Sequence, residues 1–221
     1  MTVPERPKTT LHFAQSLDGR IGLPGVRTPL SSHEGVLLAH RARAEHDAVL
    51  VGRATVTVDD PRLAAVGHEG RQPKRVVLAS TLDVRVGARV LQGGPGTLVV
   101  GVEGRASAAA QARLEAEGAT VKLVAADDGG LVSLPAALAA IRAWGVERLL
   151  VEGGARVLSA FLRGRLADEA TVEIAPRLLG APAVAAVGEV GVVRIEHAIT
   201  IDEPTVERAG ASVVVRGRLV Y

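Results

Sequence analysis

The sequence predicts an α/β protein: a mostly parallel central sheet with helices on both faces and antiparallel strands at its C-terminal end. Two observations lead to this expectation. Up to Leu166, short apolar runs typical of buried strands alternate with helix-like segments, an order that indicates a parallel sheet covered on both sides. Beyond Leu166 the chain alternates apolar and polar residues with a period of two and has no helical segments between, which indicates antiparallel strands.

The elements are justified in chain order by apolar runs and by capping residues. The expected strands of the parallel part are 9–16, 47–52, 74–80, 97–102, 119–126 and 146–154. The expected helices are 31–46, 106–118, 133–145 and 155–166. Asp18 and Gly19 suit a tight turn, and residues 67–73 suit a polar loop. The expected antiparallel strands are 168–180, 192–201 and 205–221.

Composition narrows the class of protein. Of the 221 residues, 48% are hydrophobic but only 2% are aromatic, which predicts one aliphatic core and a single domain spanning 1–221, with residues 1–8 as a flexible lead. The absence of cysteine excludes disulfides, thiolate metal sites and a cysteine nucleophile. The net charge of +2 comes without a dense basic stretch, so we expect no nucleic-acid partner. With no signal-like or long apolar run, we expect a soluble, cytoplasmic protein without a membrane partner.

Two segments follow buried strands at the sheet edge where ligands of α/β proteins bind. Glu152, Gly153 and Gly154 lie between a strand and a helix start, where glycines let a backbone approach an anion. A tight turn without a ligand is the alternative. However, a carboxylate at this point favours a function, because an unpaired buried charge costs several kcal/mol.

The second segment is the acidic corner at Asp59 and Asp60, which is stopped by Pro61. Such a pair is poor material for a regular element, and a solvated loop is the alternative interpretation. Adjacent carboxyls can also divide the roles of acid and base between them. Gly52 would allow close backbone approach, and Thr55 offers a hydroxyl donor.

The helix expected at 31–46 starts with Ser31 and Ser32 and carries Arg43, a set that suits a phosphate, although an ordinary surface helix is the alternative. The six histidines show no metal-site spacing, so no metal is expected.

Four stretches together resemble a known family. They are FAQSLDGRIG (13–22), AHRARAEHDAVLVGRATVTVDDPRL (39–63), LLVEGGARVLSAFL (149–162) and EIAPRLLG (173–180). They resemble the reductase domain of the riboflavin-pathway bifunctional deaminase–reductase, which has a dihydrofolate-reductase-like fold. The zinc motif of the deaminase half is not in the sequence, which implies a free-standing reductase.

The resemblance implies an NADPH-dependent enzyme that reduces 5-amino-6-(5-phosphoribosylamino)uracil, or its diaminopyrimidinone relative, to the ribityl product. It implies Asp60 as the carboxyl that handles a proton or holds the sugar, with Asp59 and Glu152 beside it. The residues implied for the cofactor are Gly52, Thr55, Ser80, Gly153, Gly154 and Ala155. Those implied for the substrate are His12, Ser31, Ser32, Arg43 and Leu63. Arg105, Ser107 and the Ser80–Thr81 pair are candidates for the 2′-phosphate of the cofactor. The resemblance also implies a homodimer.

Two departures from the family pattern leave the substrate open. His12 stands where members often carry lysine, and the tryptophan usual near Pro29 is missing. A dihydrofolate-like or pterin reductase, or a reductase of another heterocycle, is therefore the alternative, and a non-catalytic NADPH-binding module is a third.

Overall fold

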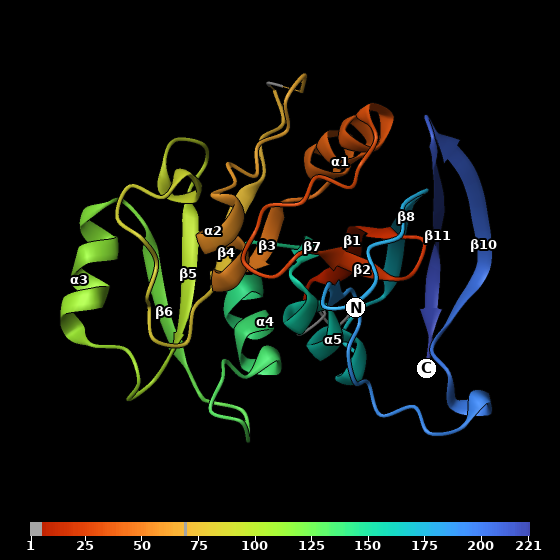
Figure 1. Ribbon diagram of the computed structural model, residues 1–221. Helices are drawn as coiled ribbons and strands as arrows, with labels where there is room; N and C mark the ends of the chain where they lie inside the picture. The colour runs from red at the N-terminus through yellow and green to blue at the C-terminus, as the bar shows by residue number, and fades with distance from the viewer. Residues whose placement is uncertain (1–5, 69) are drawn as a thin grey trace, which may run out of the picture.

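A nine-stranded sheet runs through the computed structural model, which describes residues 6–68 and 70–221 (Figure 1). The strand order is β10-β11-β8-β1-β7-β3-β4-β5-β6. The strands are β1 (Lys8–Ser16), β3 (Ala48–Gly52), β4 (Lys74–Leu78), β5 (Thr97–Val102), β6 (Thr120–Val124), β7 (Arg148–Gly153), β8 (Glu169–Ala175), β10 (Thr200–Ala209) and β11 (Ser212–Val220). From β8 to β6 all neighbours are parallel, whereas β11 is antiparallel to both β8 and β10. A separate ribbon pairs β2 (Arg20–Gly22) with β9 (Val184–Ala185).

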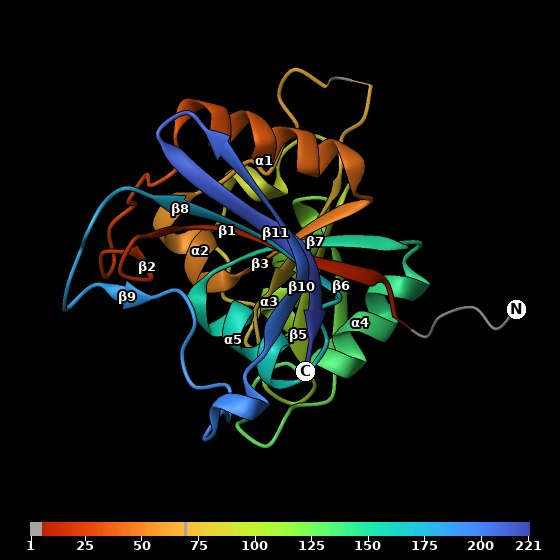
Figure 2. The same cartoon turned by 90° about the vertical axis from the view of Figure 1, so that its right-hand side faces the viewer.

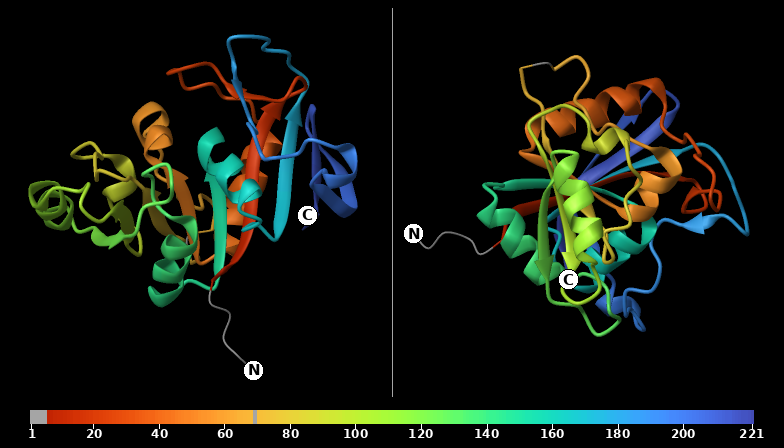
Figure 3. Two further views of the ribbon diagram at one scale, coloured as in Figure 1. Left: turned by 90° about the horizontal axis from the view of Figure 1, so that it is seen from below. Right: turned by 90° about the vertical axis from the view of Figure 1, so that its left-hand side faces the viewer.

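Helices cover both faces of this sheet, as predicted. They are α1 (His33–Glu45), α2 (Arg53–Asp59), α3 (Ala108–Ala116), α4 (Leu134–Ala143) and α5 (Ala155–Arg163), with short 3₁₀ turns η1 (Arg89–Leu91) and η2 (Ile195–His197). Figure 2 shows α1 on one side of the strands and α4 and α5 on the other. Figure 3 shows α3 at one end of the molecule and the β10–β11 hairpin at the other.

The alternation of side chains along each strand decides what reaches each face. On β1, Leu11 and Phe13 belong to the aliphatic core beneath α4 and α5. Thr10, His12 and Ala14 therefore point to the face that carries α1. A second core on that face gathers Val56 of α2 and Leu114 of α3 against β3, β4 and β5.

The C-terminal strands differ from the prediction in direction and extent. The strand expected at 168–180 is β8, which ends at Ala175 and runs parallel to β1; only its other neighbour, β11, is antiparallel. The reason is the crossover helix α5, which returns the chain from the end of β7 to the edge of the sheet where β7 begins. The next strand, β8, therefore runs in the same direction as β7. Only the last two residues of 192–201 are in a strand, and 205–221 is not one strand but the end of β10, a turn and β11.

The start of the chain is more ordered than expected over the described residues. Lys8 is already the first residue of β1, and Arg6 pairs with Asp168 at 2.7 Å. Residues 1–5 of the expected lead lie outside the described residues. Within the described chain, we find no helix with the length and apolar character needed to cross a membrane.

The acidic corner is also more regular than expected, because α2 fills residues 53–59. Its β-branched residues are weak helix formers, but Val56 is 2% exposed and packs into the second core, so tertiary packing outweighs propensity. The helix ends at Asp60, which adopts the left-handed conformation with φ 42° directly before Pro61.

Candidate active site

A cleft with two lobes opens where β1, β3 and β7 reach their carboxyl ends. The glycine lobe, lined by Gly22, Gly25 and Gly154 among others, has a volume of about 390 Å³. The arginine lobe, lined by Arg27, Arg62 and Arg89 among others, has a volume of about 660 Å³. The two lobes share several lining residues, among them Ala14, Ser31, Arg43, Thr55, Asp59 and Glu152. The turn after β7 and the corner after β3 thus meet in one cleft, as an active site at this sheet edge requires.

The glycine turn brings the start of α5 to the glycine lobe. Gly154 is the N-cap of α5 and makes no side-chain capping bond, so the backbone N–H groups at the start of α5 have no side-chain acceptor from their cap, and Gly154 and Ala155 line the lobe. A Cβ on Gly154 would lie 3.3 Å from the Thr55 hydroxyl, so the Gly154 backbone and Thr55 lie close together. Gly153 lies behind the lobe lining, and its φ of +105° is a conformation for which glycine is suited.

Arg43 and Glu152 form one buried unit. The Arg43 Nε and Nη2 atoms donate to the two Glu152 carboxylate oxygens at 2.7 and 2.8 Å, and the side chains are only 17% and 13% exposed. Arg43 also donates to the Ala64 carbonyl at 3.1 Å. Burial alone would raise the pKa of Glu152, but the Arg43 guanidinium outweighs burial and lowers that pKa. Glu152 is therefore an ionised partner of Arg43 rather than a proton donor, and Arg43 is not a free phosphate clamp.

The two aspartates of the corner separate. Asp59, at the end of α2, lines both lobes, and burial raises its pKa although Arg27 opposes the effect. Asp60 is absent from the described lining of both lobes. Its Oδ1 accepts a hydrogen bond from the backbone N–H of Arg89 at 2.9 Å, and its Oδ2 pairs with Arg85 at 2.7 Å. The hydrogen bond from Arg89 is the main reason why the pKa of Asp60 is lowered. Of the two neighbouring aspartates, Asp59 is thus the one that lines the cleft, whereas Asp60, the carboxyl implied by the resemblance, is engaged by Arg85 and the Arg89 amide.

The residues expected on the substrate side divide in the same way. His12 lines the glycine lobe, and burial lowers its pKa despite the nearby Glu152, so the imidazole is neutral at pH 7. Ser31 lines both lobes, and Leu63 lines the arginine lobe. Ser32 is absent from the described lining of both lobes, and its hydroxyl caps α1 by accepting from the Gly35 amide at 2.9 Å and donates to the Ala209 carbonyl at 2.8 Å.

A side cavity of about 300 Å³ lies next to the glycine lobe, with Ala54 in the wall of both. Among the expected cofactor residues it is lined by Gly52, Ser80, Thr81 and Arg105. Arg53 and Arg156 add positive charge to it. Ser107 instead caps α3 by accepting from the Ala110 amide at 3.1 Å.

Glycine lobe and side cavity together suit a long ligand with an anionic middle. Such a ligand would run along the surface that Gly154 and Thr55 form together, where an added Cβ would be crowded. Its negative charge would meet the uncapped start of α5, which favours anions. These residues therefore fit a dinucleotide with one end in the glycine lobe and the other beside Ser80.

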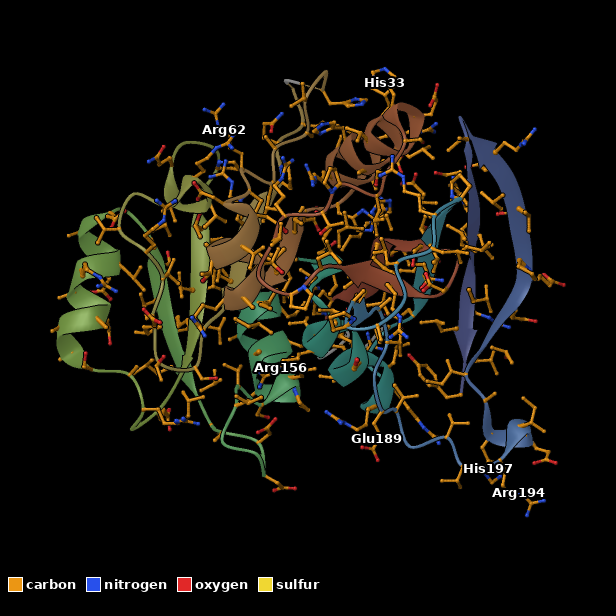
Figure 4. All side chains as sticks on the ribbon, viewed as in Figure 1. His33, Arg62, Arg156, Glu189, Arg194 and His197 are labelled. Atoms are coloured by element: carbon orange, nitrogen blue, oxygen red, sulfur yellow. The ribbon has the colours of Figure 1, made fainter. Side chains whose placement is uncertain are left out.

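Sequence reasoning missed the three arginines of the arginine lobe and the part of the lobe lining that comes from β2. Arg27, Arg62 and Arg89 sit in loops or a 3₁₀ turn, where no periodicity marks them. Figure 4 places Arg62 in the upper half of the view, where α1 also lies, and Arg156 of α5 in the lower half. The separation of Asp59 from Asp60 could have been found had α2 been predicted, because Thr55 and Asp59 are four residues apart and share one helix face.

Comparison with known proteins identifies relatives over nearly the whole chain. The sequence profile of the RibD C-terminal domain family matches residues 7–215. The riboflavin biosynthesis protein RibD of Aquifex aeolicus is 33% identical over 96% of this chain, which spans only 57% of that relative. The 2,5-diamino-6-ribosylamino-4(3H)-pyrimidinone 5′-phosphate reductase of Methanothermobacter thermautotrophicus is 35% identical over 79% of this chain and 80% of the relative.

Solved structures support the predicted fold. RibD of Acinetobacter baumannii superposes with a TM-score of 0.85 at 24% identity, over 98% of this chain and 59% of that one. The Saccharomyces cerevisiae riboflavin biosynthesis reductase Rib7 superposes with a TM-score of 0.78 at 21% identity, over 100% of this chain and 93% of that one.

Proposed function

We propose that this chain, which belongs to the RibD C-terminal domain family, is an oxidoreductase of riboflavin biosynthesis that reduces a phosphorylated ribosylaminopyrimidine with NADPH. The observation that carries the proposal is the two-lobed cleft in which Asp59, Thr55 and Gly154 meet the Arg43–Glu152 pair. The relatives named as 2,5-diamino-6-ribosylamino-4(3H)-pyrimidinone 5′-phosphate reductases support the substrate class, and the candidates are this compound and its deaminated form, 5-amino-6-(5-phosphoribosylamino)uracil.

The glycine lobe and the side cavity are the proposed cofactor site. Gly154 and Ala155 at the start of α5 would hold the pyrophosphate by their backbone, with Thr55 opposite. Ser80, Thr81 and Arg105, which line the side cavity, would bind the 2′-phosphate and so favour NADPH over NADH. When bound, the nicotinamide supplies a hydride.

The reaction needs one proton as well as the hydride. The bond between C1′ and the ring oxygen of the ribosylamine breaks, C1′ gains the hydride, and the ring oxygen gains a proton to become the 4′-hydroxyl of the ribityl chain. Asp59 is our candidate for this proton donor, because it lines both lobes and burial raises its pKa. The Arg43–Glu152 pair and neutral His12 would orient the pyrimidine by hydrogen bonds without exchanging protons.

The arginine lobe is the proposed site of the substrate phosphate. Arg27, Arg62 and Arg89 line it, whereas Arg43 already has its charge matched by Glu152. A guanidinium pairs with phosphate through two parallel N–H bonds. Ser31, which lines both lobes, would add a hydroxyl between phosphate and sugar.

We further propose that the protein acts in the cytoplasm as a homodimer. The apolar side chains exposed on the terminal hairpin support the dimer, with Val206 65% and Val220 43% exposed. Light scattering after size exclusion at micromolar concentration tests this, and a monomer would contradict it.

The test of the proposed function is anaerobic oxidation of NADPH by the purified protein. The deaminated ribosylaminouracil phosphate, its undeaminated form and dihydrofolate are offered in parallel. We expect turnover with one of the two phosphorylated pyrimidines. Turnover of dihydrofolate alone, or NADPH binding without turnover of any, would contradict the proposal.

A further inference from the structure

Polar contacts hold α1 on the sheet together with the packing of Ala42 against the second core. Of its 13 residues only Gly35 is buried, and Leu37 is 53% exposed. At its far end, the His46 ring lies 3.2 Å from the Thr10 hydroxyl. In its last turn, Arg43 pairs with Glu152. The position of α1 on the sheet therefore depends on each of these polar contacts, which we call its anchors.

The anchor at the start of α1 is a buried carboxylate on the neighbouring part of the sheet. Glu173 of β8 is 3% exposed, and its Oε1 accepts from the backbone N–H of Ser32, the N-cap of α1, at 2.8 Å. The negative charge lies at the positive end of the helix, where it is favourable. Glu173 is in register with Ala14 of β1, so both side chains face α1.

Gly35 shows how closely the helix sits on this carboxylate. A Cβ added to Gly35 would collide with the carboxyl group of Glu173, so only glycine allows α1 to lie this low. Ser32 completes the joint, since its hydroxyl binds both the Gly35 amide and the Ala209 carbonyl. The height of α1 at its first turn is therefore set by Glu173.

We infer that Glu173 is a positioning residue that sets the width of the substrate side of the cleft. The inference rests on the proposed function, because the same helix and its leading residues place Ser31, Ala39, His40 and Arg43 in the wall of the arginine lobe. Glu173 itself is absent from the described lining of both lobes and acts through α1. Ser31, Ala39 and Arg43 also line the glycine lobe, but the side cavity of the proposed cofactor site is lined by residues of α2 and α5 and by no residue of α1.

The test compares Glu173→Ala and Glu173→Gln with a control on the same strand. Glu169→Ala removes an exposed carboxylate that pairs with Lys8 at 2.5 Å. Since a hydrogen bond to a charged group is lost, Glu173→Ala should raise KM for the pyrimidine by about tenfold and KM for NADPH by clearly less, with kcat within about twofold. Glu173→Gln keeps an acceptor for the Ser32 amide and should restore most of the affinity, and Glu169→Ala should match the wild type.

A second measurement follows α1 without turnover. Amide hydrogen exchange in residues 33–38 should be faster in Glu173→Ala and unchanged in Glu169→Ala. Faster exchange with an unchanged KM for the pyrimidine would overturn the inference and leave Glu173 a purely structural residue. Absence of pyrimidine turnover in the wild type would overturn the proposed function, and the substrate role of Glu173 with it. Wild-type turnover with an unaltered Glu173→Ala variant would overturn this inference alone.

Discussion

Breaking the Arg43–Glu152 pair should destabilise the protein far more than breaking an exposed pair on the same helix. The pair has two charge-assisted bonds of 2.7 and 2.8 Å and side chains that are 17% and 13% exposed, so solvent screens it little. Leaving one partner of such a pair buried alone costs about 3–5 kcal/mol. We therefore expect Arg43→Leu and Glu152→Leu each to lower the free energy of unfolding by about 4 kcal/mol.

The double variant should recover part of this loss. With leucine at both positions no unpaired charge is left. The free energy of unfolding of the double variant should therefore be about 2 kcal/mol higher than the value obtained by adding the two single effects. The measurement is urea unfolding followed by the fluorescence of Trp144, the single tryptophan, which is the C-cap of α4. The control cycle is Arg41 and Glu45, an i,i+4 pair 69% and 46% exposed, whose coupling should be about 0.5 kcal/mol or less.

The pH dependence of the same pair has a definite sign. The pKa of Glu152 in the folded protein is below its ordinary value of 4.5, because Arg43 outweighs the burial that would raise it. The stabilisation is therefore fully present above pH 4.5 and is lost as the pH falls through the lowered pKa. Additive effects in the Arg43–Glu152 cycle at pH 7, within about 0.5 kcal/mol, would refute the reasoning.

Three further predictions concern the cofactor, the phosphate and the acid. Gly154→Ala places a Cβ 3.3 Å from the Thr55 hydroxyl, so KM for NADPH should rise about tenfold while the far-ultraviolet circular dichroism stays unchanged. Arg62→Ala should raise KM for the phosphorylated pyrimidine by about tenfold or more but not KM for its dephosphorylated form; equal effects on both would exclude a phosphate contact. Asp59→Asn should raise Tm at pH 7 but not at pH 3, because burial raises the pKa of Asp59 and its ionisation above that pKa opposes folding; calorimetry at both values checks the sign.

The parallel part of the sheet and its helices could be predicted because their signals are local. The run from Ala48 to Gly52 is buried throughout, and serines at 32, 107 and 133 precede three of the helices. The direction of β8 could not be read in this way, since a period of two shows a half-buried strand but not its neighbours. The crossover through α5 decides that direction.

The candidate site was predictable to the level of segments but not of single carboxylates. The acidic corner after β3 and the glycine turn after β7 line one cleft, as expected for two segments at the same edge of the sheet. Asp59 and Asp60 are equivalent in sequence, and only the end of α2 turns one into the cleft and the other towards Arg85. The sequence does not indicate this helix, because its Thr and Val residues have low helix propensity. The helix is stabilised instead by the burial of Val56 in the core.

Comparing the single variants Asp59→Asn and Asp60→Asn tests most directly the central claim that Asp59 is the proton donor. The two side chains are neighbours in sequence but face different surroundings. In steady-state NADPH oxidation with the phosphorylated pyrimidine, Asp59→Asn should lower kcat by about 10²–10⁴-fold, the range expected for loss of a general acid. Asp60→Asn should lower kcat by a few-fold at most. A loss of kcat in Asp60→Asn with an active Asp59→Asn enzyme would contradict the account.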